Sequence, residues 1–429
     1  MEPPQPPPTV PPVPARRPLL KTAPRLGAVA RAVTAANSTS RSVGERVMYA
    51  RKQRLVLQKN PVTGGTPITP EEAVTLRQVT FGSALVPPRT DWLRSGLVFR
   101  EPEQPLGFGL VAARSTTGGL LSVVQAQVIK HLLFDSAPRD AQRKVDELLR
   151  PTLMQQQEAL IHAISTILWR AGEKTCSRVC LPQDLPIVAA SQNFLPDGVT
   201  EKLHLYEFTT LEDLQIFIKR YSYMFQEETG PGMMLLLYSA VLSRGPSKVM
   251  KDLDNDKAFL MGAAEEGSHC VIMLLLTGRA TPYLHNGVIY VGDEDHYALP
   301  QFGVLARTEV GLLWDEATGS DDESRKPGSR LKTPSLPVWV IRCAGHYGVI
   351  FSTNRELLRN YHAERRFELQ YYTCEGGYCQ MTVDTRYEED QNSSKETNRE
   401  NSVIPQLEKV IHTKWQGAHI TCHTTAALV

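Results

Sequence analysis

The chain has 429 residues and a formal net charge of +1, and 41% of its residues are hydrophobic. This length allows one large domain with tails, or two domains. Because the charge is nearly balanced, we expect neither a nucleic-acid partner nor attraction to an anionic membrane surface. The most apolar run, residues 233–242, is about half as long as a bilayer crossing requires.

Residues 1–75 have the composition of a disordered, basic tail. The opening MEPPQPPPTVPPVP favours a polyproline helix, which serves as a spacer or as a ligand for SH3 or WW domains. Between Glu2 and Glu45 every charged residue is basic, as in a transit peptide, but the early prolines would break the amphipathic helix of such a peptide. We therefore expect a solvated tail, with an SH3 or WW partner as the alternative.

We expect the folded region to begin near Arg77. Within it, the spacing of apolar residues predicts several helices. The first covers about residues 119–134 and follows a turn of small residues. The others are expected from Pro151 to a stop at Gly172, over 211–225 after a capping-box pattern, up to residue 242, and over 269–278.

Strand patterns rich in branched and aromatic residues follow at 287–291, 337–342 and 346–351. Polar loops are expected at 318–330 and 387–402. Helices followed by strands, without alternation, indicate an α+β domain, which we place at residues 76–418 with a tail at 419–429.

Possible metal sites fail on spacing. Asp252, Asp254 and Asp256 start like a calcium loop, but Lys257 and Ala263 stand where the turn glycine and the bidentate glutamate belong. A zinc site needs two ligand pairs at suitable spacing. The pairs Cys176–Cys180 and Cys374–Cys379 have no such second pair nearby, and the remaining candidates lie at the far C-terminus, namely His419, Cys422 and His423. With no phosphate loop either, we expect no metal and no cofactor.

The seven cysteines are odd in number, scattered, and preceded by no secretory signal. Such a set is typical of free thiols in a reducing compartment. We therefore expect an intracellular protein, cytoplasmic, nuclear or both.

His346 stands at the start of a predicted strand, directly after the turn residue Gly345. A lone histidine in such a place is most often a structural residue. It is also where a general base for a distant nucleophile would project into a cleft. The pattern alone leaves both interpretations open.

A series of motifs over residues 77–418 resembles the MINDY deubiquitinases, in the branch of the third and fourth members and nearest to a catalytically inactive fourth-type member. The motifs, in order, are Phe81-Gly82-Ser83 with Pro87 and Trp92, Phe108-Gly109-Leu110-Val111, Val124-Gln125 with Leu132-Leu133-Phe134, LLLTG at 274–278, LKTP at 331–334 with Pro337 and Trp339, HYGVIFS at 346–352, and TKW at 413–415. The resemblance implies a papain-like cysteine protease fold that hydrolyses isopeptide bonds in proteasome-directing polyubiquitin.

The family mechanism implied by this resemblance uses a cysteine at the start of the first long helix, a histidine on a strand, and a glutamine that stabilises the oxyanion. The histidine matches His346. The cysteine position falls on Gly118, after Thr117 in place of a proline, and the glutamine position falls on Ala112. Glycine has no side chain, so no acyl-enzyme can form there. Loss of one oxyanion donor lowers kcat by a further factor of about 10²–10³.

Three hypotheses follow. The first is a pseudoenzyme that retains a cleft for ubiquitin or polyubiquitin. The second is a residual deubiquitinase that uses a hydroxyl of Ser115, Thr116 or Thr117, although we expect these hydroxyls to cap the helix instead. The third is a scaffold that acts through the proline-rich tail without ubiquitin. Cys343 lies three residues before His346 on the same strand segment, so it is a poor substitute nucleophile.

Overall fold

The computed structural model describes residues 59–112, 115–136, 145–254, 258–262, 268–292, 299–315, 325–343, 345–386 and 405–426. The proline-rich tail, the expected loop 387–402 and much of the expected loop 318–330 lie outside these residues, as does part of the segment rejected above as a calcium loop. The helices are α1 (Pro70–Phe81), α2 (Thr90–Leu93), α3 (Gly118–Lys130), α4 (Val145–Leu148), α5 (Leu153–Ala171), α6 (Leu211–Arg220), α7 (Ser222–Gln226), α8 (Gly232–Arg244), α9 (Pro246–Asp252), α10 (His269–Thr277), α11 (Ser329–Lys332) and α12 (Pro405–His412).

In the described part of the chain, the strands form one large and three small sheets. They are β1 (Thr66–Pro67), β2 (Val98–Phe99), β3 (Leu110–Val111), β4 (Ser177–Pro182), β5 (Leu203–Phe208), β6 (Val288–Val291), β7 (Leu299–Phe302), β8 (Gly311–Trp314), β9 (Val338–Cys343), β10 (His346–Phe351), β11 (Arg366–Tyr372), β12 (Tyr378–Asp384) and β13 (His419–Ala426). The large sheet has the order β13-β12-β11-β10-β9-β8, and only the β8–β9 pair is parallel. As expected, the fold mixes helices and sheets.

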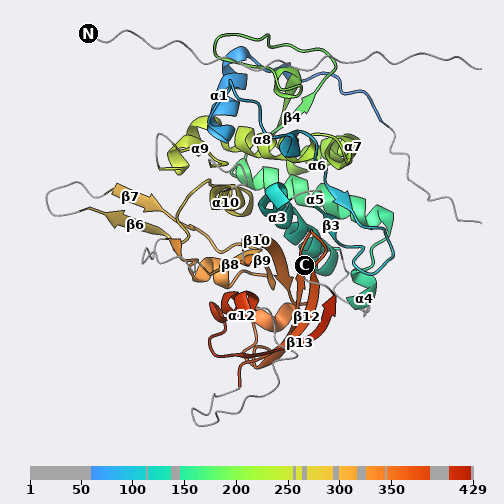
Figure 1. The fold of residues 1–429 in the computed structure, drawn as a ribbon, viewed down its shortest axis with the longest axis vertical. Coiled ribbons are helices and arrows are strands. Elements are labelled where there is room, and N and C mark those ends of the chain that lie inside the picture. Colours follow the sequence, from blue (N-terminus) through green and yellow to red (C-terminus); the bar gives the residue numbers. More distant parts are fainter. Residues whose placement is uncertain are drawn as a thin grey trace, which may run out of the picture. The chain divides into compact units, whose positions relative to one another are not determined.

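The large sheet is covered on both faces. Along β9, Val338 and Val340 join the main core, whereas Trp339 and Ile341 join a second core that includes residues of α12. This alternation follows from the two-residue period of a strand. On the main-core side α3 packs against β9 and β10, and Figure 1 shows the helices of the first half gathered on that side. The sheet and α3 therefore position each other.

The predicted helices α3, α5, α8 and α10 are present with nearly the expected limits. Gly172 and Gly278 stand at the ends of α5 and α10, as the stop signals indicate. The expected helix 211–225 is interrupted at Tyr221, where a φ of −112° separates α6 from α7.

Both expected domain limits need correction. Ordered structure begins before residue 76, because Thr69 and Glu72 form a capping box that starts α1 at Pro70. At the other end, the segment expected as a tail from residue 419 is the edge strand β13, which pairs with β12. The 318–330 loop also ends early, since α11 starts at Ser329.

The cysteines differ from the expectation in one respect. Neighbouring strands β12 and β13 bring Cys379 and Cys422 together as a disulfide, so these two are not free thiols. The other five cysteines are free. Among the described helices, none is long and apolar enough to span a bilayer.

Candidate functional site

The start of α3 is built from small residues. A 3₁₀ turn, Ser115–Thr117, leads directly into Gly118. A Cβ atom at Gly118 would have no heavy atom of another described part of the fold within 4 Å, whereas one at Gly119 would lie 3.3 Å from the Tyr347 ring. Gly119 thus packs against Tyr347, the residue that follows His346. Gly118 and His346, the predicted nucleophile and base positions, are therefore each adjacent in the chain to one partner of this contact.

A buried glutamine fastens the preceding strand to α3. Gln125 donates its amide to the carbonyl of Phe108 (3.0 Å) and accepts from the backbone N–H of Leu110 (2.5 Å). These bonds hold β3 in place, and Ala112 follows at its end. The N–H of Ala112 donates to the carbonyl of Cys374, 2.9 Å away.

His346 has an acidic partner that sequence reasoning missed. Its Nδ1 lies 3.3 Å from Oε2 of Glu375, and the two side chains are 58% and 38% exposed. Glu375 belongs to the turn 373–377 between β11 and β12, in which Gly376 adopts a φ of +116°. The same turn binds Ala112 through Cys374. The turn therefore links the Ala112 and His346 positions. The local sequence signal for Glu375 was a carboxylate beside the glycines of a turn.

The N-cap residue of α3 lacks the side-chain capping bond that the sequence predicts. Thr116 donates its hydroxyl to Oδ2 of Asp91, 3.0 Å away. Thr117 occupies the N-cap position but makes no capping bond through its side chain. Its φ of −94° and ψ of 2° leave the backbone in a turn rather than in the extended conformation of a typical cap. Nothing is described for the Ser115 side chain.

Four of the five free thiols are buried and offer no alternative nucleophile. Burial raises the pKa of Cys180 to about 12 and that of Cys270 to about 11. Burial also raises the pKa of Cys343, whose side chain lies in the second core, and that of Cys374. Because the thiolate is the reactive form, these buried thiols are poor nucleophiles.

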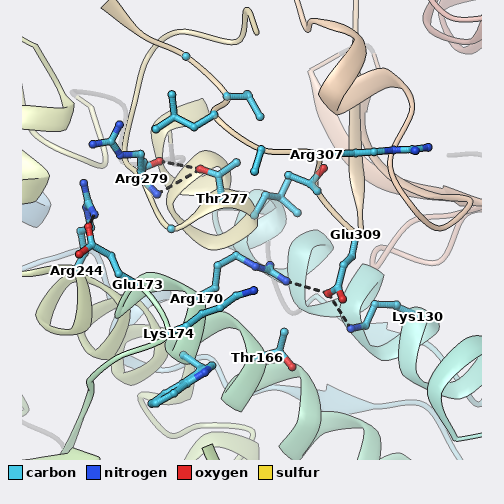
Figure 2. A pocket seen from close by; sticks show the side chains of 18 of the residues that line it. Lys130, Thr166, Arg170, Glu173, Lys174, Arg244, Thr277, Arg279, Arg307 and Glu309 are labelled. Atoms are coloured by element: carbon cyan, nitrogen blue, oxygen red, sulfur yellow. Dashed lines mark hydrogen bonds and ion pairs between the residues drawn. The ribbon is translucent and has the colours of Figure 1, made fainter. Parts of the chain in front are cut away.

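A cavity of about 640 Å³ lies at the opposite end of α3, beside Lys130 (Figure 2). At 1.5 Å per residue this is roughly 18 Å from Gly118. Glu309 accepts from Lys130 (3.1 Å) and Arg170 (3.2 Å), and Arg170 also donates to the carbonyl of Leu275 near the end of α10. Lys130 and Arg170 thus neutralise the Glu309 carboxylate, and Arg170 also satisfies a carbonyl at the C-terminal end of a helix. None of the site residues predicted from the sequence lines this cavity.

Comparison with known proteins yields a family match over most of the chain. The family described as "Deubiquitinating enzyme MINDY-3/4, conserved domain" matches residues 77–424. The probable ubiquitin carboxyl-terminal hydrolase MINDY-4 of Xenopus tropicalis is 33% identical over 366 residues, which is 85% of this chain and 47% of that protein. The human protein of the same name is 30% identical over 362 residues, 83% of this chain and 46% of that protein.

A weaker similarity reaches a second branch of the family. The ubiquitin carboxyl-terminal hydrolase MINDY-3 of Xenopus tropicalis is 26% identical over 263 residues, 56% of this chain and 55% of that protein. The chain spans about half the length of the curated relatives it matches. No solved structure matches it.

Proposed function

Because the chain belongs to the MINDY-3/4 family of deubiquitinating enzymes, we propose that it is an inactive member of that family, a pseudo-deubiquitinase that retains a papain-like fold and binds ubiquitin. The observation that carries this proposal is Gly118. It stands at the first position of α3, beside the strand that begins at His346, and it supplies no atom that can attack a carbonyl.

The surroundings of Gly118 support a retained cleft. The space next to it is free of described side chains, and His346 and Glu375 are both accessible to solvent. Gln125 and the 373–377 turn hold the adjoining strands with buried hydrogen bonds. A surface that once received the carboxyl-terminal segment of ubiquitin would keep its shape on such a framework. We propose that polyubiquitin binds there without being cleaved.

The hydroxyl alternative is weaker. The Thr116 hydroxyl is bonded to Asp91, and the Thr117 side chain is buried at 1% exposure, so neither is presented to His346 as an attacking group. An alcohol also needs stronger activation than a thiol. The scaffold alternative depends on the tail, which lies outside the described residues.

Chain cleavage tests the proposal directly. The purified full chain should leave proteasome-directing polyubiquitin intact, as should the variants Ser115→Ala, Thr116→Ala and Thr117→Ala. Cleavage by the unmodified protein that is abolished by His346→Ala would overturn the proposal. Cleavage lost in one hydroxyl variant would identify that residue as the nucleophile.

Binding is tested separately by calorimetry with monoubiquitin and polyubiquitin. Heat of binding that disappears when a bulky residue fills the open space, as in Gly118→Trp, supports the retained cleft. Absence of heat and of NMR shift changes in ubiquitin favours the scaffold hypothesis, for which a peptide of residues 1–14 and an SH3 or WW domain are the next partners to test.

A further inference from the structure

Two helical segments face each other with a matching pair of potential metal ligands on each. Glu158 and His162 are four residues apart on one face of α5. His131 and Asp135 have the same spacing in the π-helical segment η2 (His131–Asp135), which continues α3. Such π-helical turns occur frequently at functional sites. The ligand atoms of His131, Glu158 and His162 all lie within 4.8 Å of one another.

The imidazole rings of His131 and His162 stack on each other. They are stacked with centroids 4.2 Å apart and an interplanar angle of 18°. His131 is 6% exposed, and its Nδ1 has no hydrogen-bond partner among the described residues. The nearest carboxylate oxygen, Oδ2 of Asp135, is 4.0 Å from it. A buried, unpaired ring nitrogen beside a second histidine and a carboxylate lacks a partner that a cation would supply.

We propose that His131, Glu158 and His162 bind a divalent transition-metal ion such as Zn²⁺. Two imidazole nitrogens and one carboxylate oxygen form a ligand set suited to zinc. A neutral imidazole donates the lone pair of a ring nitrogen to such an ion. The site is independent of the proposed ubiquitin cleft, because it lies at the other end of α3.

The surroundings supply outer partners and an open position. The side-chain amide nitrogen of Gln215 on α6 lies 3.4 Å from Nδ1 of His162. An ion bound at Nε2 leaves the ring proton on Nδ1, so this amide must turn to accept that proton through its oxygen. Oδ2 of Asp135 is paired with Nζ of Lys130, 3.2 Å away. Glu158 and His162 also line a cavity of about 410 Å³ between α5 and α6, through which water or a fourth ligand can reach the ion.

Binding requires a small rearrangement. Two ligands about 2.1 Å from a tetrahedral zinc ion are roughly 3.4 Å apart. The ligand atoms, which lie within 4.8 Å of one another, must therefore close by up to about 1.4 Å, and the rings must turn away from parallel. Glu158 is exposed and His162 is only partly buried, so both can move without disturbing the core. His131 stays fixed by its burial.

Calorimetric titration of the chelator-treated full chain with ZnCl₂ tests the proposal. We expect one site for the unmodified protein and at least a tenfold weaker affinity for Glu158→Gln and for His162→Ala. His362→Ala, which removes an exposed histidine elsewhere, serves as the matched control and should bind normally. Binding that persists unchanged in both site variants, as expected for adventitious thiol binding, would overturn the proposal, as would absence of binding.

A spectroscopic measurement separates a defined site from a loose one. With Co²⁺ in place of Zn²⁺, the site should give the intense visible absorption of a four-coordinate ion, and His162→Ala should lose it. Thermal melting provides a control for folding, since Glu158 and His162 lie at the edge of the core and their variants should melt near the unmodified protein without metal. Only the unmodified protein and His362→Ala should gain stability with Zn²⁺.

Discussion

Gly118 and Gly119 are adjacent in the chain but differ in the room around them. A side chain at Gly118 meets no other described part of the fold within 4 Å, whereas one at Gly119 meets the Tyr347 ring. Because Gly118→Cys fills open space, we expect it to change the free energy of unfolding by less than about 1 kcal/mol. Gly119→Cys should be clearly more destabilising, as overpacking costs about 1–3 kcal/mol. Chemical denaturation measures both, and equal losses would contradict the open space.

Combined with Ala112→Gln, the Gly118→Cys variant also tests thiol chemistry at this position. The free thiols with raised pKa, such as Cys180 and Cys270, should react slowly with a ubiquitin probe that has a thiol-reactive group. We therefore expect labelling of Gly118→Cys with Ala112→Gln but not of the unmodified protein, as judged by a mass shift of one ubiquitin. Gly118→Ser with Ala112→Gln is the matched control without a thiol. Labelling of the unmodified protein would contradict this expectation.

At the residue scale, sequence reasoning reached His346 and Gly118 but not their surroundings. Both positions stand at the start of a long apolar element, so periodicity and a family resemblance locate them. Glu375 is 29 residues further along the chain from His346, and only the pairing of β10 with β11 brings its turn close. The local signal, a carboxylate in a glycine turn, does not say which residue that carboxylate faces. The zinc ligands proposed here were missed for the same reason, since η2 and α5 meet only in the fold.

At the scale of elements, we expect replacement of two buried glutamines on α3 to affect stability in opposite ways. Gln125 satisfies two backbone groups of the 108–110 segment, and its replacement by leucine leaves both unpaired and buried. We expect Gln125→Leu to cost about 1–3 kcal/mol for each buried group left unpaired. Gln127 is equally buried, but its side-chain amide has no hydrogen-bond partner in the described part of the fold. Gln127→Leu should therefore be neutral or stabilising. Urea denaturation of the two variants checks this, and equal destabilisation would refute the role of Gln125.

Helices were easier to predict than strands. The helices α5 and α10 combine a sustained apolar stripe with a glycine stop, and both signals are local. The edge strand β13 has the sequence HITCHTTA, whose weak alternation does not stand out until β12 offers a partner. The helix α1 shows the reverse error, because the Thr-Pro-Glu-Glu cap at residues 69–72 was a local signal that went unused.

Deletion of residues 419–429 tests the importance of β13 to the large sheet. The deletion removes the partner of β12 and leaves a long strand edge exposed, which promotes pairing with other molecules. We expect a lower melting temperature and concentration-dependent aggregation, measured by calorimetry and light scattering. A deletion of residues 427–429 alone spares the strand and serves as the control. If both deletions melt alike, β13 contributes nothing to the sheet.

At the scale of the whole molecule, the nearly balanced charge conceals a fully buried ion pair. Nη1 of Arg77 on α1 lies 2.7 Å from Oδ2 of Asp197, and both side chains are 0% exposed. Asp197 also accepts from the N–H groups of Val199 and Thr200. The pair thus fastens the first helix to a segment 120 residues away in the chain. Composition could not reveal this pair, because the count of charges is silent about their location.

Removing one charge of this pair should cost far more than removing one from an exposed pair. Asp197→Asn keeps the size of the side chain but leaves the Arg77 charge buried without a counterion, so we expect a loss of about 3–5 kcal/mol. Glu207→Gln breaks the pair with Arg178, in which both side chains are about half exposed, and should cost less than about 1 kcal/mol. Urea denaturation of the two variants compares them directly. Similar losses would mean that water reaches Arg77, and that α1 is not held to the 195–200 segment by a buried charge.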